Sequence, residues 1–268
     1  MKKNLLTVII LTKNEEERIS DCIDSVVGWA DEIIVFDDES RDRTKEIAES
    51  KGAKVFVKKM EVEGTHRNWA YGHATCEWVL SLDADERMTS ELKDEITEKI
   101  ALNPKEDAFT MPRKNYIGDY WIRGGGLYPA AQLKLFRKDK FKWEEVEVHP
   151  RAFLDDRENY GHLKKDMIHY SYRDWSDFLS KSNRQTTLEA KKWYNVYLEK
   201  PGKARYKMNV YHAVWRGLNR FRSAFINRRG YIDGFIGFMI AYFACLYQII
   251  SCAKFWELYK NDPRNKKK

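Results

Sequence analysis

Two acidic clusters, each at the end of an apolar run, are the residues of this sequence best placed to do chemistry. Asp37-Asp38 follows the run 33–36, and Asp83-Ala84-Asp85 follows the run 78–82. Side chains at the carboxyl ends of parallel strands face the crevice in which open α/β sheets bind ligands. The Asp-x-Asp pair places two hard oxygen ligands close enough to share one divalent cation beside a substrate's phosphates. Together the clusters suggest an enzyme that acts on a nucleotide sugar.

The elements that must position these clusters alternate between strand and helix, as in a parallel sheet. Apolar runs at 5–11, 32–36, 54–57 and 78–82 predict strands, and helices are expected near 15–27, 43–51, 66–76 and 89–100. Asn14 and Thr89 precede helix starts, and Gly52 marks a helix end. The sequence therefore predicts an α/β fold whose first hundred residues bind the nucleotide.

The texture of the sequence changes beyond Pro104, where short aromatic strands and glycines follow one another. This pattern indicates a smaller, mixed sheet on the acceptor side, with further helices from about Trp175 onward. We expect a catalytic domain over 1–200, with a nucleotide-sugar half at 1–103 and an acceptor half at 104–200, and a helical extension at 201–268. The Gly124-Gly125-Gly126 run lacks the strand-to-helix context of a phosphate loop and is expected to be a turn.

Composition predicts a globular protein. The chain has 268 residues, of which 43% are apolar and 33% charged, with a formal net charge of +7. These values exclude a disordered chain and a polytopic membrane protein. The four cysteines form no Cys-x-x-Cys pair, so they are interpreted as thiols in a reducing compartment. The run at 5–11 is short for a signal peptide and is interpreted as the first strand.

Three motifs in the first hundred residues resemble those of inverting glycosyltransferases of family 2, which have a GT-A fold. The motifs are Thr7-Val8-Ile9-Ile10-Leu11-Thr12-Lys13-Asn14-Glu15, Asp37-Asp38-Glu39-Ser40-Arg41-Asp42-Arg43-Thr44 and Asp83-Ala84-Asp85. A narrower resemblance covers nearly the whole chain and is to bacterial lipopolysaccharide core glucosyltransferases that add a β-linked hexose to an inner-core heptose. Its marks are Arg67-Asn68-Trp69-Ala70, Leu82-Asp83-Ala84-Asp85-Glu86-Arg87, Leu133-Lys134-Leu135-Phe136-Arg137, His169-Tyr170-Ser171-Tyr172 and Asp233-Gly234-Phe235-Ile236-Gly237-Phe238.

The resemblance implies a metal-dependent transferase with a defined donor site. A bound Mg²⁺ or Mn²⁺ would stabilise the negative charge that develops as the diphosphate leaves, and Asp85 is the expected metal ligand. Asp83 is expected to contact the ribose or to support the metal through water. The expected donor-binding residues are Thr12, Glu15, Asp37, Arg67 and Asp83. For Arg67 an exposed helix position is the alternative. Capping and turn formation are expected instead for Asp38, Ser40 and Asp42.

The general base is ambiguous in the sequence. Inversion requires a carboxylate or imidazole that removes the proton of the acceptor hydroxyl. Glu145, Glu147 and His149 alternate on one face of a predicted strand, so any of them could be the base. The core transferases have Val-His-Glu where this chain has Val148-His149-Pro150, and we therefore rank Glu145 and Glu147 ahead of His149. A solvated acidic strand edge is the alternative for these glutamates.

The C-terminal extension combines an uncharged run with a basic stretch. Residues 234–252 are uncharged, and this run is close to the ~20 residues that a helix needs to cross the hydrocarbon of a membrane. Residues 200–230 contain many Lys and Arg and no acidic residue, and their apolar residues recur at helical spacing. We expect peripheral attachment to the cytosolic face of the inner membrane, so that the protein is cytoplasmic. Packing against the catalytic domain or in a homo-oligomer interface is the alternative.

These expectations combine into one predicted activity. The donor is expected to be a UDP-hexose, UDP-glucose above all, and the acceptor a lipid-linked saccharide, namely the lipopolysaccharide inner core. A polyprenyl-linked glycan or another cell-envelope glycan is the alternative acceptor. A nucleic-acid-binding protein, suggested by Tyr211, Trp215 and Phe221 within the basic stretch, is not expected. A noncatalytic protein that binds sugar nucleotides is opposed by the intact Asp83-x-Asp85.

Overall fold

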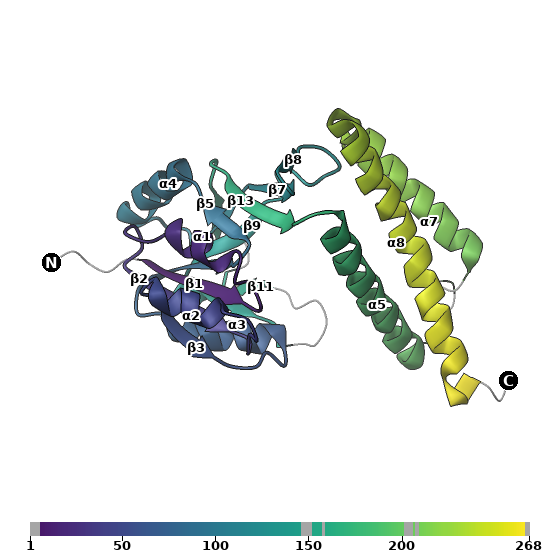
Figure 1. The fold of residues 1–268 in the computed structure, drawn as a ribbon, viewed down its shortest axis with the longest axis horizontal. Helices are drawn as coiled ribbons and strands as arrows, with labels where there is room; N and C mark the ends of the chain where they lie inside the picture. Colours follow the sequence, from purple (N-terminus) through teal and green to yellow (C-terminus); the bar gives the residue numbers. More distant parts are fainter. Residues whose placement is uncertain (1–5, 146–151, 157–158, 201–205, 207–208, 266–268) are drawn as a thin grey trace. The chain divides into compact units, whose positions relative to one another are not determined.

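The computed structural model describes residues 6–145, 152–156, 159–200, 206 and 209–265. Its contacts divide the chain into two compact units (Figure 1). The first unit comprises Met1–Lys114 and Ala130–Tyr170, and the second comprises Asn115–Pro129 and Ser171–Lys268. The expected functional boundaries at residues 103 and 200 stay predictions.

A seven-stranded sheet forms the centre of the first unit, in the order β12-β6-β9-β4-β1-β2-β3. The strands are β1 (Leu6–Thr12), β2 (Glu32–Asp37), β3 (Lys54–Val57), β4 (Trp78–Asp83), β6 (Ala108–Met111), β9 (Gln132–Arg137) and β12 (Tyr160–His162). Strands β1 to β4 are parallel, and β9 runs antiparallel to both β4 and β6. The four strands predicted from the first apolar runs are therefore present and adjacent.

Alternation along the strands distributes the core over two layers. Val8 and Ile10 of β1 face one layer, which also contains buried residues of α1 (Ile19–Asp24), α2 (Thr44–Ser50) and α4 (Ser90–Ala101). Ile9 faces the other layer, together with residues of α3 (Glu63–Gly72) and of the β10 (Phe141–Trp143) and β11 (Ala152–Leu154) pair. Successive side chains of a strand point to opposite faces, so a continuous apolar strand needs cover on both sides. Helix α3 begins at Glu63, about one turn earlier than predicted.

Each unit also contains a short antiparallel strand pair. In the first unit, β5 (Glu86–Met88) pairs antiparallel with the start of β13 (Met167–Tyr172). In the second unit, the end of β7 (Arg113–Ile117) pairs antiparallel with β8 (Tyr120–Ile122). The expected α/β fold, with a mostly parallel sheet, smaller mixed pairings and a C-terminal helical region, is confirmed.

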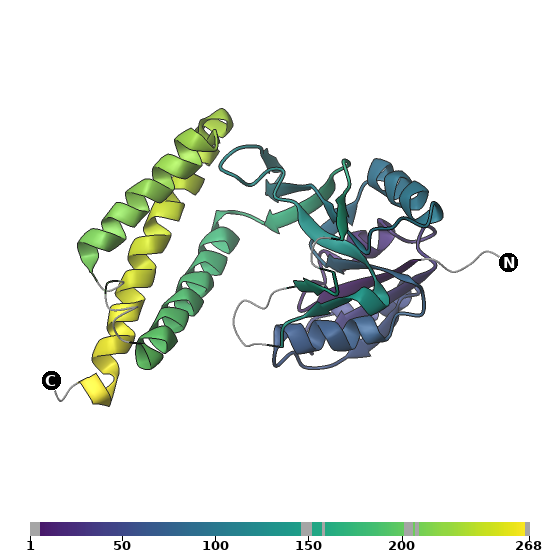
Figure 2. The ribbon, with the colours of Figure 1, turned by 180° about the vertical axis from the view of Figure 1, so that it is seen from behind.

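Three long helices dominate the second unit, and they lie side by side in both views (Figures 1 and 2). They are α5 (Trp175–Glu199), α7 (Val210–Arg222) and α8 (Gly234–Asn261). A π-helical segment, Ser223–Asn227, and a short 3₁₀ helix, Gly230–Asp233, connect α7 to α8. By length and hydropathy, residues 230–261 could cross a membrane, although a third of the most apolar window is buried within the protein.

The connection between α7 and α8 is held by the buried carboxylate of Asp233. This carboxylate accepts hydrogen bonds from the backbone N–H of Gly124 at 2.6 Å and of Arg123 at 3.1 Å. A Cβ atom at Gly237 would lie 1.8 Å from the carbonyl oxygen of Gly230, so only glycine permits this approach. The glycine turn at 124–126 thus anchors the helix connection.

Candidate active site

The predicted donor-binding residues of β1, β2 and β4 lie at neighbouring strand ends. The register pairs Thr12 with Asp37 and Leu11 with Asp83. The Thr12 hydroxyl is buried and has no hydrogen-bond partner among the described residues. Buried polar atoms are normally satisfied, so an unpartnered hydroxyl at this edge marks a place where a bound ligand could supply the partner.

The two carboxylates of the first cluster have different partners. Asp37 Oδ1 accepts hydrogen bonds from the Ser40 backbone N–H at 3.0 Å and from the Ser40 hydroxyl. Asp38 binds the Lys13 ammonium at 2.7 Å and the Met60 backbone N–H at 2.7 Å. Burial acts to raise the pKa of Asp38, but the hydrogen bonds from Lys13 and Met60 outweigh it and lower that pKa. Asp38 therefore joins the segments around Lys13 and Met60, and these two contacts differ from the helix cap or turn expected for it.

The loop after β1 is tied to the loop after β2. The Glu15 backbone N–H donates to the Thr44 hydroxyl at 2.8 Å, and the Asn14 backbone N–H donates to the Ser40 hydroxyl at 2.8 Å. Asp42 accepts from the Thr44 N–H at 3.1 Å, close to the start of α2. The first two bonds tie Asn14 and Glu15, which follow β1, to Ser40 and Thr44, which follow β2.

Asp83 is held by two cations. Its Oδ2 lies 2.8 Å from Lys134 Nζ, and its Oδ1 lies 3.3 Å from Arg67 Nη2. Lys134 also binds the fully buried Glu86 at 2.7 Å, and Glu86 accepts the Asp83 backbone N–H at 2.9 Å. Burial alone would raise the pKa of Asp83, but the charges of Lys134 and Arg67 hold it well below its usual range.

The same network sets the charge state of the cations. Burial would lower the pKa of Lys134, but Asp83 and Glu86 outweigh it and raise that pKa. Arg67 also pairs with Glu63 at 3.0 Å and lies over the Trp143 ring at 5.2 Å. The guanidinium of Arg67 is therefore oriented toward the strand end, and an exposed position on the helix is not what the structure shows.

Asp85 faces a histidine from a distant part of the sequence. Its Oδ2 lies 3.4 Å from His169 Nε2 of β13 and 3.9 Å from Arg18 Nη1. The Tyr170 backbone N–H donates to the Asp85 carbonyl at 2.9 Å, which fixes the turn after β4 against β13. The carboxylate of Asp85 and the imidazole of His169 thus lie next to each other.

The Asp85 and His169 pair suits a divalent cation that shares its coordination with a substrate. Two ligands at 3.4 Å can occupy neighbouring positions around an ion with bonds of about 2.1 Å. No group of three His, Cys, Asp or Glu side chains that could hold a metal occurs within the described part of the chain. Mg²⁺ and Mn²⁺ commonly bind at phosphates through one or two protein carboxylates plus water, and Asp85 would supply such a carboxylate. The His169 imidazole is a nitrogen donor, which suits the transition metal Mn²⁺ better than the harder Mg²⁺. The residues present therefore fit such an ion.

His169 and Lys134 are site residues that sequence reasoning missed. Both occur within the motifs of the narrower resemblance, but neither was assigned a role. The signal for Lys134 is a charged residue inside the apolar strand β9. His169 carries no comparable local signal, because only the pairing of β13 with β5 brings it to Asp85.

The expected base segment is described in part. Glu145 is exposed and accepts a hydrogen bond from the Asn68 side-chain amide at 3.3 Å. Asn68 also accepts from the Trp143 backbone N–H at 2.8 Å, and so holds the end of β10 next to Arg67. Glu147 and His149 lie outside the described residues. The structure thus places Glu145 next to the Arg67 helix.

Comparisons with known proteins agree with the motifs. Residues 7–156 match the model of glycosyl transferase family 2. An uncharacterized glycosyltransferase of Rickettsia typhi is 31% identical over 96% of this chain and 88% of its own length. The lipopolysaccharide core biosynthesis glycosyltransferase LpsC of Rhizobium meliloti is 21% identical over 97% of this chain and 94% of its own length.

Among solved structures, glucosyl-3-phosphoglycerate synthase from Mycobacterium tuberculosis is similar to this chain. It was solved with Mn²⁺, uridine diphosphate and glucosyl-3-phosphoglycerate, and it is 18% identical with a TM-score of 0.41. The similarity covers 51% of this chain and 57% of that one. On the family match over more than half of its length, this chain belongs to glycosyltransferase family 2 and is a glycosyltransferase with the α/β architecture expected of a GT-A fold.

Proposed function

We propose that this glycosyltransferase is metal-dependent and inverting, and that it transfers glucose from UDP-glucose to a lipid-linked saccharide. The lipopolysaccharide inner core is the proposed acceptor. The observation that carries the proposal is the approach of Asp85 to His169, 3.4 Å apart, next to the Asp83 carboxylate that Lys134 and Arg67 hold ionised. Charged groups fixed at strand ends are what binding and cleavage of a nucleotide diphosphate sugar require.

The donor would be bound by side chains already held in place. The unpartnered Thr12 hydroxyl and the buried Asp37 carboxylate would contact polar groups of the nucleoside, together with Glu15 and Asp83. Arg67 brings a fixed positive charge to the same edge. In this proposal these residues bind and orient the donor.

Asp85 and His169 are the residues that would hold a cation. Mg²⁺ or Mn²⁺ supplies, when bound, positive charge beside the departing diphosphate. Lys134 does not compete for this role, because its ammonium is bound to Asp83 and Glu86.

Inversion requires one proton transfer and one displacement. The acceptor hydroxyl oxygen forms a bond to the anomeric carbon of the sugar while the bond from that carbon to the diphosphate oxygen breaks, and a carboxylate takes the hydroxyl proton. We assign the carboxylate to Glu145 or Glu147. The hydrogen bond from Asn68 supports Glu145 as the base. Asn68 is next to the donor-binding residue Arg67 in the sequence, so this bond holds the Glu145 carboxylate on the helix that carries Arg67.

The acceptor assignment is supported by the relative LpsC, whose name places it in lipopolysaccharide core biosynthesis and which matches nearly the whole chain. A polyprenyl-linked or other envelope glycan is the alternative acceptor. All four cysteines are free, which supports a reducing, cytosolic location of the enzyme. We propose that it acts at the cytosolic face of the inner membrane, where donor and lipid-linked acceptor meet.

The test is a donor panel with the purified enzyme. Release of nucleotide from several nucleotide sugars is measured with and without Mn²⁺, in parallel series with a lipid-A-core extract and with a polyprenyl-linked glycan. We expect metal-dependent release of UDP from UDP-glucose that the core extract stimulates. If only the polyprenyl-linked glycan stimulates release, the acceptor assignment changes to that glycan. If nucleotide is released only from a different sugar nucleotide, the donor assignment changes to that compound. Equal release without metal would reject the metal-dependent mechanism.

A further inference from the structure

We propose that the helical unit binds the surface of an anionic membrane through one apolar face that α7 and α8 share. We call this surface the apolar face, and it consists of Val214, Trp215, Leu218, Phe235, Phe238 and Tyr242. This surface would make the membrane contact of the location proposed above, on which its role rests. Lipid headgroups and acyl chains are the proposed occupant of the face.

Three large apolar side chains of this face are mostly exposed. Phe235 is 72% exposed, Trp215 62% and Leu218 61%. Isolated exposed apolar residues are ordinary, but a contiguous group marks an interaction surface. On α7 the residues recur at positions 214, 215 and 218, and on α8 at 235, 238 and 242, which is the spacing of one helix side.

Ring contacts link Phe238 of α8 to the end of α7 and to the segment that follows it. The Phe238 ring lies 5.7 Å from that of Phe221 and 6.0 Å from that of Phe225. Gly217 allows the helices to approach closely, since a Cβ there would lie 2.8 Å from Cys245 Sγ. The exposed residues of α7 and α8 therefore flank a shared aromatic seam.

The charge around the apolar face favours anionic lipid. Between Lys200 and Trp256 the sequence contains a single acidic residue, Asp233, and its side chain is fully buried. Arg222 follows Leu218 by one turn of α7, and Arg229 is exposed in the connection to α8. Exposed cations without neighbouring carboxylates attract the negative surface of a cytoplasmic leaflet, and each contributes separately.

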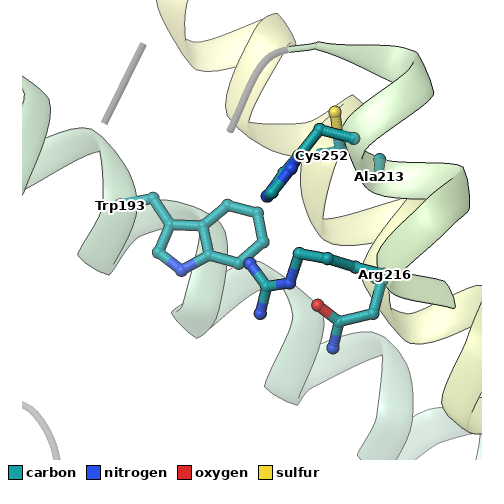
Figure 3. A pocket seen from close by; sticks show the side chains of 6 residues that line it. Trp193, Ala213, Arg216 and Cys252 are labelled. Carbon is teal, nitrogen blue, oxygen red and sulfur yellow. The ribbon is translucent and has the colours of Figure 1, made fainter. Parts of the chain in front are cut away.

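One arginine of the basic stretch has a different role. Arg216 extends toward the indole of Trp193 on α5, at 5.6 Å from the ring centre (Figure 3). It lines a small pocket with Ala213 and Cys252. Arg216 therefore joins helices, and we do not assign it to the membrane surface.

The packing of α8 indicates that this helix lies on the membrane and does not cross it. Lys254 of α8 binds Asn183 and Thr186 of α5, and the Tyr247 hydroxyl donates to the Gln185 carbonyl. The charged residues along α5 are Asp177, Lys181, Arg184, Glu189, Lys191, Lys192 and Glu199. If α8 crossed the membrane with α5 packed against it, these charged side chains would enter the hydrocarbon interior, which is strongly unfavourable. An interfacial position buries the apolar face alone.

The test measures binding of the full-length protein to vesicles of phosphatidylcholine, with and without phosphatidylglycerol, at low and high salt. We expect binding that requires phosphatidylglycerol and weakens with salt. The double variant Trp215→Ser with Phe235→Ser should bind about tenfold more weakly or worse. Leu102→Ser, which removes a 79% exposed leucine from the other unit, should bind like the wild type.

A second pair of variants tests the charge. Arg222→Glu with Arg229→Glu should weaken binding by about thirtyfold or more. Lys191→Glu with Lys192→Glu changes the net charge equally on α5 and should weaken it much less. The replaced side chains are exposed, so we expect every variant to keep its fold. Thermal unfolding of each variant checks this.

Three results would overturn the inference. The first is unchanged binding by both double variants. The second is a protein that resists extraction from membranes at alkaline pH, as a spanning helix does. The third is an oligomer that Trp215→Ser with Phe235→Ser dissociates while no vesicle binding occurs, which would make the face an interface between copies. Vesicle binding is measured without donor or acceptor, so its failure is distinct from a failure of the proposed reaction.

Discussion

The carboxylate of Asp85 and the imidazole of His169 face each other at 3.4 Å, although they come from the turn after β4 and from the strand β13. A carboxylate of the Asp-x-Asp motif thus gains a nitrogen donor that no local sequence pattern announces. The approach depends on the antiparallel pairing of β13 with β5, which sets His169 opposite Glu86. The approach of these two side chains is therefore a property of the sheet as well as of the motif.

The first prediction concerns these two ligands. Asp85→Ala should abolish metal-dependent turnover, and His169→Ala should raise the Mn²⁺ concentration needed for half-maximal activity by about tenfold or more. The reason is that each variant removes one of the two proposed protein ligands. Calorimetric titration of Mn²⁺ in the presence of UDP provides a readout besides activity. His162→Ala, at an exposed histidine of β12, is the matched control and should behave like the wild type. Full metal affinity in Asp85→Ala would contradict the assignment.

The second prediction separates the base from its neighbour. Glu145→Gln or Glu147→Gln, but not both, should lower kcat by about a hundredfold or more, because an amide cannot accept the hydroxyl proton. The KM for the donor should stay unchanged, since donor binding does not need this carboxylate. Steady-state kinetics with a saturating acceptor measures both quantities. If both variants keep wild-type kcat, neither glutamate is the base and His149 becomes the candidate to replace.

The third prediction concerns the stability of the Lys134 network. Lys134→Met should lower the free energy of unfolding by about 3–5 kcal/mol, because it leaves Asp83 and the fully buried Glu86 without their shared cation. Urea denaturation measures this change. Lys142→Met makes the same substitution at an exposed position of β10 and should change stability by about 0.5 kcal/mol or less. An equal effect of the two substitutions would show that the network contributes nothing specific.

The fourth prediction is a pH dependence with a definite sign. The pKa of Asp83 is lowered in the folded state, so its contribution to stability is complete above the unfolded value of about 4 and is lost as the pH falls below it. Lys134, whose pKa is raised, contributes fully below about pH 10 and loses its contribution as the pH rises further. Asp83→Asn should therefore show a shallower loss of stability below pH ~4 than the wild type. Parallel acid denaturation curves for the two proteins would oppose this account.

The fifth prediction tests the helix connection. Gly237→Ala should destabilise the protein by about 1–3 kcal/mol or more, because the new methyl group would collide with the Gly230 carbonyl oxygen. Gly72→Ala adds the same methyl group at the end of α3, where nothing lies within 4 Å, and should be neutral or slightly stabilising. Thermal unfolding compares the two. Equal melting temperatures for both variants would mean that the backbone around Gly230 and Gly237 can move apart to accommodate the methyl group.

The sequence by itself determined the nucleotide-binding half of the fold. Apolar runs ending in Asp37 and Asp83 predicted β2 and β4, and the helices between them predicted their parallel order, because hydrophobic periodicity and turn residues are local properties. The family followed from the order and spacing of motifs in the same segment. The uncharged run that became α8 was also visible, since length and composition suffice to recognise it.

Only the tertiary structure decided which side chains meet. The approach of His169 to Asp85 and of Lys134 to Asp83 depends on strand pairings between residues far apart in the sequence, and periodicity carries no information about such pairings. The direction of Arg216 was equally hidden, because its place in a basic stretch suggests a headgroup contact while packing turns it toward Trp193. Sequence therefore supplies the chemical groups of this site, and long-range strand and helix packing selects the ones that act together.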